Sequence, residues 1–401
     1  MANDNNKAVL AFSGGLDTSY CAVYLKNMGF EVHAITVDTG GFTPADRQQI
    51  EERAQQCGVA SFRYADVTRD YYDSCIRYLI YGNVLKNGTY PLSVSAERII
   101  QALTVARYAQ ELNAAHVAHG STGAGNDQIR FDMIFQGMLP GVHIITPIRD
   151  KKLSREEEIA YLHEHGIEIN AAKAAYSINK GLWGTSVGGK ETLGSKEYLP
   201  EEAWPTPVTK TGEEKITLRF EKGELTAINT QTFEHPAQAI SHLQELAQPY
   251  GIGRDIHVGD TIIGIKGRVG FEAAAPLIII KAHHLLEKHT LTKWQLSWKD
   301  NLGSWYGNWL HEGQMMDPVM RNIEKFLADT QQTVSGEVYV TLQPYRFTLT
   351  GIESPHDMMS SKFGSYGEMN KTWSADDVKG FARIFGNQNS IFHAINEQQH
   401  D

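Results

Sequence analysis

The chain has 401 residues, of which 41% are hydrophobic, so it can form two or three domains with sizeable cores and wholesale disorder is excluded. Its 37 Lys and Arg residues against 47 Asp and Glu residues give a formal net charge of −10, which argues against a nucleic-acid partner. Three cysteines without a CxxC pattern predict neither a disulfide framework nor a zinc site and favour a reducing compartment. The polar N-terminus and the lack of an apolar run of about 18 residues predict a cytoplasmic protein without a membrane partner.

Strands and helices are expected to alternate along the first 168 residues. Short apolar runs predict the strands, and helical spacing with capping signals predicts the helices between them. The expected elements are a strand at Lys7–Phe12, a helix at Asp17–Met28, a strand at Val32–Val37, a helix at Pro44–Cys57, a strand at Ser61–Val67, helices near Asp70–Leu85 and Ser95–Leu112, a strand at Ala114–His119, and a helix from the capping box at Ser154 to near Gly166. This order predicts an α/β fold with a parallel sheet, whose ligands bind at the carboxyl ends of the strands.

The pattern changes after about residue 168. Gly and Pro become scattered, and hairpin-like alternation occurs at Lys215–Asn229 and Glu337–Thr350. Helices are expected near Pro236–Ala247 and Ala273–Lys288, and an amphipathic helix near Ser374–Phe385. We therefore expect three parts: an α/β domain at 1–168, an α+β domain at 169–370, and a C-terminal helical tail at 371–401.

The loop at residues 13–19, SGGLDTS, lies between an expected strand and an expected helix. A glycine pair lets the backbone approach a ligand closely, and the following helix points free N–H groups and its positive dipole end at that ligand. Ser13, Thr18 and Ser19 add hydroxyl donors. The stretch predicts a phosphate-binding loop, with a plain strand–helix turn as the alternative.

A second glycine-rich stretch, HGSTGAGNDQIRF at 119–131, follows another expected strand. Alone it is equally typical of a surface loop that caps a helix through Asn126 or Asp127. Together, however, SGGLDTS resembles the pyrophosphate loop of N-type ATP pyrophosphatases, and the second stretch resembles the HGxTGKGNDQVRF motif of argininosuccinate synthases, with Ala124 in place of the lysine. The resemblance continues in order through TYPLSVSAER (89–98), GLWGTS (181–186), GIGR (251–254), GIKGR (264–268) and GIESP (351–355).

Membership of this family would imply an adenine nucleotide alpha hydrolase-like domain followed by a synthetase and oligomerisation domain. It would imply a cytoplasmic homotetrameric ligase of arginine biosynthesis that joins citrulline to aspartate through a citrullyl-AMP intermediate and releases AMP and pyrophosphate. ATP would be a substrate and Mg²⁺ would bridge its phosphates. Catalysis would then depend on positioning and on stabilising phosphate charge.

The resemblance also assigns roles to individual residues. Asp17, Ser13, Arg130 and Asp127 would be catalytic. The ATP-binding residues would be Ala11, Phe12, Ser13, Gly14, Gly15, Leu16, Asp17, Thr18, Ser19, Val37 and Gly120. Aspartate would be bound by Thr122, Asn126 and Asp127, and citrulline by Tyr90, Ser95, Asn126, Arg130, Ser177 and Ser186, with Gly259 and Phe271 at its amino-acid end.

Positions 259 and 271 depart from the family pattern. Where the family has VENRxxGxKSRGxYE, residues 258–272 read VGDTIIGIKGRVGFE, so Gly259 replaces a glutamate and Phe271 a tyrosine. One interpretation is drift, with Asp260 or Glu272 compensating. The other is that Gly259 leaves room for an acyl group, so that the acceptor is an N-acylated citrulline.

Two functions of other kinds fit the same nucleotide domain. A tRNA-modifying ATP pyrophosphatase would need a basic surface and usually a cysteine pair. A non-catalytic adenine-nucleotide sensor would keep the first loop without needing the residues of the second. No metal site is expected, because His283, His284 and Glu287 share one expected helix without a clear fourth ligand.

Overall fold

A computed structural model of the chain describes residues 6–123, 125–168, 176–360, 366–367 and 372–397. The chain forms two compact units, Met1–Ser354 and Pro355–Asp401, and each is described by itself. Ala124, where the sequence departs from the family motif, lies outside the described residues.

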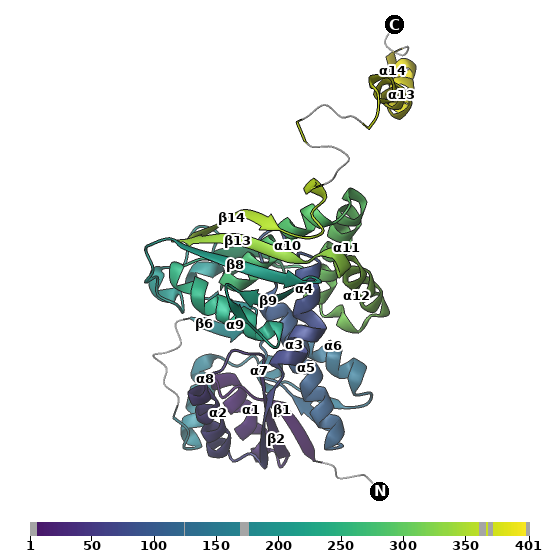
Figure 1. Cartoon of the computed structure of the whole chain (residues 1–401). Helices are drawn as coiled ribbons and strands as arrows, with labels where there is room; N and C mark the ends of the chain where they lie inside the picture. Colours follow the sequence, from purple (N-terminus) through teal and green to yellow (C-terminus); the bar gives the residue numbers. More distant parts are fainter. Residues whose placement is uncertain (1–5, 124, 169–175, 361–365, 368–371, 398–401) are drawn as a thin grey trace. The chain divides into compact units, whose positions relative to one another are not determined.

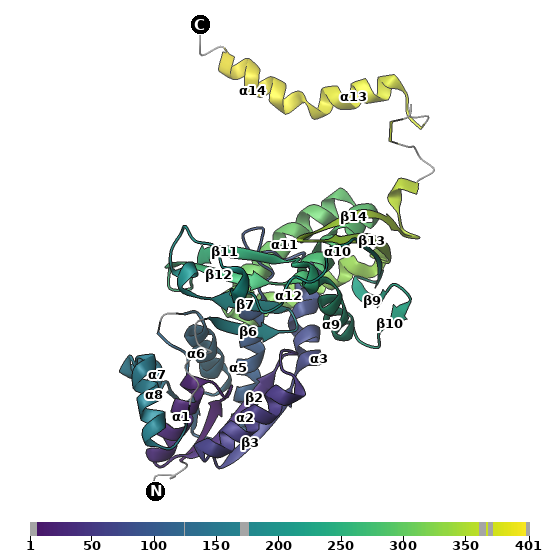
Figure 2. The same cartoon turned by 90° about the vertical axis from the view of Figure 1, so that its left-hand side faces the viewer.

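The N-terminal part of the first unit contains the parallel sheet that the alternating pattern predicts (Figures 1 and 2). Its strand order is β3-β2-β1-β4-β5, and all four pairings are parallel. The strands are β1 (Lys7–Ala11), β2 (Glu31–Asp38), β3 (Ser61–Asp66), β4 (His116–Ala118) and β5 (His143–Ile145).

Helices cover both faces of this sheet, with α1 and α2 on one face and α5 on the other. The helices of this part of the chain are α1 (Leu16–Asn27), α2 (Pro44–Cys57), α3 (Thr68–Tyr71), α4 (Arg77–Tyr81), α5 (Ser93–Glu111), α6 (Asp127–Met138), α7 (Pro147–Lys151) and α8 (Arg155–Glu164); of these, α4 packs against helices of the later part of the unit. Neighbouring residues of β1 belong to different cores: Leu10 packs with the buried side chains of α1 and α2, whereas Val9 packs with those of α5. Successive side chains of a strand point to opposite faces of the sheet, so β1 contributes to an apolar layer on each face.

Local signals fix the ends of two helices where the sequence predicts them. Thr43 and Asp46 form a capping box at the start of α2, Pro44 is its first residue, and Gly58 ends it with φ +68°. Ser154 and Glu157 form the expected capping box of α8.

The helix expected near Asp70–Leu85 is interrupted. A π-helical turn at Tyr72–Ile76 separates α3 from α4. Ser74 Oγ donates to the carbonyl oxygen of Asp70, and a hydroxyl bound to the preceding turn competes with the regular backbone ladder.

The rest of the first unit is built on two antiparallel sheets. One has the order β10-β9-β8-β13-β14 and the other β11-β12-β7-β6. The strands are β6 (Ser177–Gly181), β7 (Gly184–Gly188), β8 (Glu214–Glu221), β9 (Glu224–Ile228), β10 (Gln231–Thr232), β11 (Arg254–Asp260), β12 (Lys266–Glu272), β13 (Gly336–Gln343) and β14 (Arg346–Glu353). The helices are α9 (Pro236–Ala247), α10 (Ala274–Thr290), α11 (Lys293–His311) and α12 (Pro318–Thr330).

These elements confirm the hairpins expected at 215–229 and 337–350 and the helices expected near 236–247 and 273–288. The β6–β7 and β11–β12 hairpins and the helices α11 and α12 are not predicted by the sequence pattern. The expected domain limits at 168 and 370 stay predictions; the first compact unit ends at Ser354.

The second unit contains α13 (Ala375–Phe385), which the sequence predicts, and α14 (Asn387–Glu397). Its exposed apolar side chains include Phe381, Ile384, Phe385, Phe392 and Ile395.

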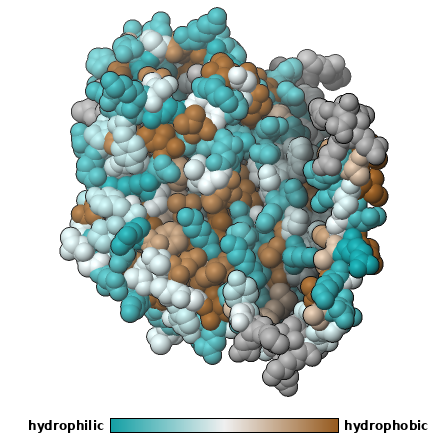
Figure 3. Space-filling view, turned by 90° about the horizontal axis from the view of Figure 1, so that it is seen from above, coloured by the Kyte–Doolittle hydropathy of each residue, from teal (hydrophilic) through white to brown (hydrophobic). Residues whose placement is uncertain are grey.

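On the face of the molecule seen in Figure 3, hydrophobic residues form patches between hydrophilic ones. No helix among the described residues combines the length and apolar character needed to cross a membrane.

Candidate active site

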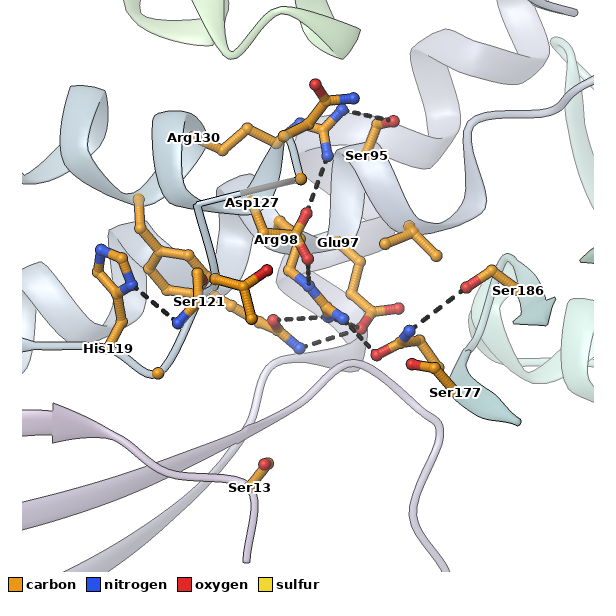
Figure 4. A pocket seen from close by; sticks show the side chains of 18 of the residues that line it. Ser13, Ser95, Glu97, Arg98, His119, Ser121, Asp127, Arg130, Ser177 and Ser186 are labelled. Atoms are coloured by element: carbon orange, nitrogen blue, oxygen red, sulfur yellow. Dashed lines mark hydrogen bonds and ion pairs between the residues drawn. The ribbon is translucent and has the colours of Figure 1, made fainter. Parts of the chain in front are cut away.

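A cavity of about 900 Å³ opens at the carboxyl ends of β1, β2 and β4. Its wall continues along α5 and α6 to the β6–β7 and β11–β12 hairpins, as residues of all these elements line it. Figure 4 shows Ser13 below and Arg130 with Ser95 above, with Ser177 and Ser186 to one side. The cavity thus joins the first glycine-rich loop to the second.

The first loop is arranged to receive an anion. Gly14 has φ +74°, and α1 begins at Leu16 behind Gly15, which has no side chain to cap the first turn. Thr18 Oγ1 lies 3.2 Å from Ser13 Oγ and accepts from Ser13 N at 3.3 Å. Two hydroxyls and the helix N-terminus therefore face the same end of the cavity.

Asp17 lines the cavity behind this loop and interacts with Glu158 of α8, which is buried. Burial raises the pKa of both carboxyls, and the repulsion between them raises that of Glu158 further, to about 8. Glu158 therefore keeps its proton near neutral pH beside Asp17.

We expect this proton to make stability depend on pH. The folded protein keeps it on Glu158, whereas a glutamate in the unfolded chain releases its proton near pH 4.3. Raising the pH from 5 to 8 should therefore lower the free energy of unfolding, by at most about 1.4 kcal/mol per pH unit for one proton. Glu158→Gln should flatten this slope in urea titrations at pH 5, 6, 7 and 8; parallel wild-type and variant curves would contradict the raised pKa of Glu158.

Arginines organise the centre of the cavity. Arg98 donates to Glu97 at 2.7 Å, to Asp127 at 3.0 Å and to Asn179 at 2.5 Å. Arg130 donates to the other oxygen of Asp127 at 3.0 Å. Although burial opposes ionisation, the two arginines hold the pKa of Asp127 below its ordinary value. Asp127 is therefore a fixed anion.

Arg130 also anchors the upper wall. It is buried and donates to Ser95 Oγ at 3.1 Å and twice to the carbonyl oxygen of His311, at 2.9 and 3.0 Å. His311 is the last residue of α11, and its Nδ1 lies 2.9 Å from the same Ser95 Oγ. Burial and the nearby Arg130 lower the pKa of His311 to about 3, so its imidazole is neutral.

Hydrogen bonds also hold the second loop. Ser121 N donates to His119 Nδ1 at 3.2 Å, and Nε2 of the same ring lies 2.9 Å from Asp132, which accepts from Arg149 at 2.7 Å. Asn126 Oδ1 accepts from Ile262 N at 2.8 Å, which ties the loop to the turn between β11 and β12.

Comparisons with known proteins agree with this geometry. The model of the "Arginosuccinate synthase N-terminal HUP domain" matches residues 7–168, and that of the "Arginosuccinate synthase C-terminal domain" matches residues 176–392. The argininosuccinate synthase of Xylella fastidiosa is 35% identical over 98% of both chains. That of Methanocaldococcus jannaschii is 35% identical over 96% of this chain and 97% of its own.

The chain belongs to the argininosuccinate synthase family.

Most of the residues predicted from the family resemblance come together in the cavity. Those that line it are Ala11, Phe12, Ser13, Gly15, Leu16, Asp17, Thr18, Val37, Tyr90, Ser95, Gly120, Thr122, Asn126, Asp127, Arg130, Ser177, Ser186 and Gly259. Three of the predicted residues are not among the lining residues: Gly14, Ser19 and Phe271. Ser19 is fully buried, and its Oγ has no hydrogen-bond partner among the described residues.

Several lining residues were missed, among them Glu97, Arg98, Asn179, His257 and His311. Strand alternation could have revealed His257, since residues two apart on a strand face the same side and Gly259 was already a candidate. Glu97 and Arg98 belong to the stretch TYPLSVSAER (89–98), but no local pattern assigns either of them a role, and none distinguishes His311.

The two departures from the family pattern have physical consequences. Phe271 is fully buried with its ring 5.3 Å from that of Tyr90. A Cβ at Gly259 would collide with the imidazole of His257, which stacks on Tyr90 at 4.9 Å. The space expected at Gly259 is therefore occupied by His257, a ring that is neutral because burial and Lys86 lower its pKa to about 4.

Proposed function

We propose that this protein condenses citrulline with aspartate to argininosuccinate at the expense of ATP, which becomes AMP and pyrophosphate. The cavity that joins the anion-binding loop to the Asp127–Arg130 network carries this proposal, together with the family membership. An adenylating ligase needs both substrates and the α-phosphate of ATP within one enclosed space.

The residue roles follow from this arrangement as proposals. The loop from Ala11 to Thr18 would bind ATP, with Ser13, Gly15 and Thr18 at the pyrophosphate. Val37 and Gly120 would line the nucleotide site. Tyr90, Ser95, Asn126, Arg130, Ser177 and Ser186 would hold citrulline, and Thr122, Asn126 and Asp127 would hold aspartate.

The reaction would proceed in two displacements. The ureido oxygen of citrulline attacks the α-phosphorus, and the bond to pyrophosphate breaks. The amine of aspartate then attacks the ureido carbon, loses its proton, and AMP leaves with the former ureido oxygen. The α1 N-terminus, Ser13 and Thr18 would stabilise the departing pyrophosphate charge.

Mg²⁺ is expected to accompany ATP and would neutralise phosphate charge. Asp17 offers the carboxylate of the loop, and the described residues contain no group of three or more His, Cys, Asp or Glu placed to hold a metal. The ion would therefore depend chiefly on phosphate oxygens and water, as Mg²⁺ sites commonly do.

The test uses citrulline labelled with ¹⁸O in the ureido group. With ATP and aspartate, label should pass to AMP, and AMP formation should require citrulline. ADP as product, or AMP without label, would contradict the mechanism. ATP binding without AMP formation would favour a nucleotide sensor, and RNA retention at about 0.15 M salt would favour a tRNA-modifying enzyme.

We also propose a cytoplasmic homotetramer. The three cysteines are unpaired, which fits a reducing compartment. The apolar side chains exposed on α13 and α14 suit subunit contacts. Light scattering should give the mass of four chains for the full protein and a smaller assembly after removal of residues 355–401; an unchanged mass would contradict a role for this segment.

A further inference from the structure

Four carboxylates line the cavity: Asp17, Glu97, Asp127 and Asp260. Asp17 is paired with Glu158, and Asp127 is bound by two arginines. Asp260 lies 2.5 Å from Lys266 and is largely exposed. Each of these three therefore already has a partner that fixes its state.

Glu97 is different. Its side chain is 3% exposed, and its Oε1 accepts from Arg98 Nη1 at 2.7 Å and from Gln101 Nε2 at 3.0 Å. Its Oε2 is buried and has no hydrogen-bond partner among the described residues. Such an oxygen costs free energy until it is bound, and burial accordingly raises the pKa of Glu97 to about 7 in spite of Arg98. A cationic ligand would relieve this cost.

The free oxygen faces the β6–β7 hairpin. A Cβ at Gly181, the last residue of β6, would collide with Glu97 Oε2. Asn179 of the same strand accepts from Arg98 and donates to Ser186 Oγ at 3.5 Å. In Figure 4 Glu97 lies on the side of Ser177 and Ser186, away from His119 and Ser121.

The reaction offers two candidate cations, the α-ammonium groups of citrulline and aspartate. The aspartate amine must be neutral when it attacks, so a carboxylate that stabilised its ammonium form would oppose the reaction. The citrulline ammonium takes no part in bond formation and can remain charged.

Asp260 and Glu272, the two residues that could replace the glutamate missing at position 259, already have other partners. Glu272 is buried with Arg254, whose Nε lies 3.2 Å from it, and does not line the cavity. Asp260 is held by Lys266, and the place of a side chain at 259 is filled by neutral His257.

We propose that Glu97 recognises the α-ammonium of citrulline and thereby selects a free amino acid over an N-acylated one. This inference rests on the proposed function. A protonated Glu97 cannot form the ion pair, so the KM for citrulline rises as the pH falls below about 7, and the ion pair excludes acceptors that lack the ammonium.

The experiment measures pyrophosphate release with citrulline, 5-ureidopentanoate, which lacks the ammonium, N-acetylcitrulline and N-succinylcitrulline. Wild type should prefer citrulline in kcat/KM by at least about 30-fold over each of the others, the scale of a charge-assisted contact. Glu97→Gln should raise the KM for citrulline by about tenfold or more, leave the KM of ATP and aspartate within about twofold, and abolish the pH dependence of the citrulline KM between 6 and 8.

Glu111→Gln is the matched control, because it makes the same chemical change on an exposed residue at the end of α5. It should leave all three KM values unchanged. An unaltered citrulline KM in Glu97→Gln, or equal use of citrulline and 5-ureidopentanoate by wild type, would overturn the inference. If Glu97→Gln does not fold, equal use of citrulline and 5-ureidopentanoate by wild type still overturns the inference. Preference for an N-acylated acceptor would also overturn it, whereas no pyrophosphate with any acceptor would remove the proposed function itself.

Discussion

Arg130→Met should lower kcat/KM for citrulline by at least about 100-fold, because a buried guanidinium that makes several charge-assisted hydrogen bonds contributes about 3 kcal/mol or more. Arg130 joins Asp127, Ser95 and the His311 carbonyl in one fork of donors. Removing it frees both the second loop and the end of α11. The measurement is steady-state pyrophosphate release at saturating ATP and aspartate.

Arg130→Lys separates the contribution of the charge of Arg130 from that of its hydrogen-bond geometry. Lysine keeps the positive charge, but its single ammonium group replaces a planar guanidinium with several N–H donors. It can therefore form only part of the hydrogen bonds that Arg130 makes. We expect an activity between those of wild type and Arg130→Met. Arg107→Met, which changes an exposed arginine of α5, is the control and should match wild type. Equal activity of Arg130→Met and Arg107→Met would show that the Arg130 fork does not position the substrate.

The parts of the fold that could be predicted are those with local causes. The limits of α2 follow from Thr43, Pro44, Asp46 and Gly58, and all four act within one turn of the helix end. The π-helical turn in the α3–α4 segment depends on a hydroxyl that competes for one carbonyl, and the spacing of apolar residues does not encode that competition.

The candidate site divides in the same way. The two glycine-rich loops are contiguous motifs, so their residues could be found from sequence. Arg130 and the His311 carbonyl are separated by 181 positions, and only the tertiary fold brings them together. Glu97 stands out solely because one of its oxygens has no partner among the described residues, a property of the folded environment.

The cluster around His283 shows why closely spaced His and Glu residues on one helix do not by themselves indicate a metal site. His283 and Glu287 are fully buried on α10, and Lys299 Nζ lies 2.8 Å from Glu287 Oε2. His283 is bound by Asn83 and Gln331 at 2.8 Å each. The cation that balances Glu287 comes from α11, a helix that the sequence pattern does not predict.

This buried ion pair gives the largest stability prediction. Lys299 is fully buried and also donates to the carbonyl oxygen of Tyr81 at 2.8 Å, so it links α11 to α10 and α4. Lys299→Met leaves Glu287 without its main counter-charge and should lower the free energy of unfolding by about 3–5 kcal/mol at pH 7. Urea titration followed by the fluorescence of the tryptophans of α11 would measure this change.

The pH dependence of that loss identifies its cause. Although burial opposes ionisation, His283 and Lys299 hold the pKa of Glu287 below its ordinary value. In Lys299→Met the carboxyl can avoid a buried charge by binding a proton, which becomes easier as the pH falls. The destabilisation should therefore shrink from pH 7 to pH 5, and Glu287→Gln added to Lys299→Met should restore much of the stability. Lys293→Met, at the exposed start of α11, should have little effect. A loss that is constant with pH and survives in the double variant would mean that Lys299 acts through its packing and not through its charge.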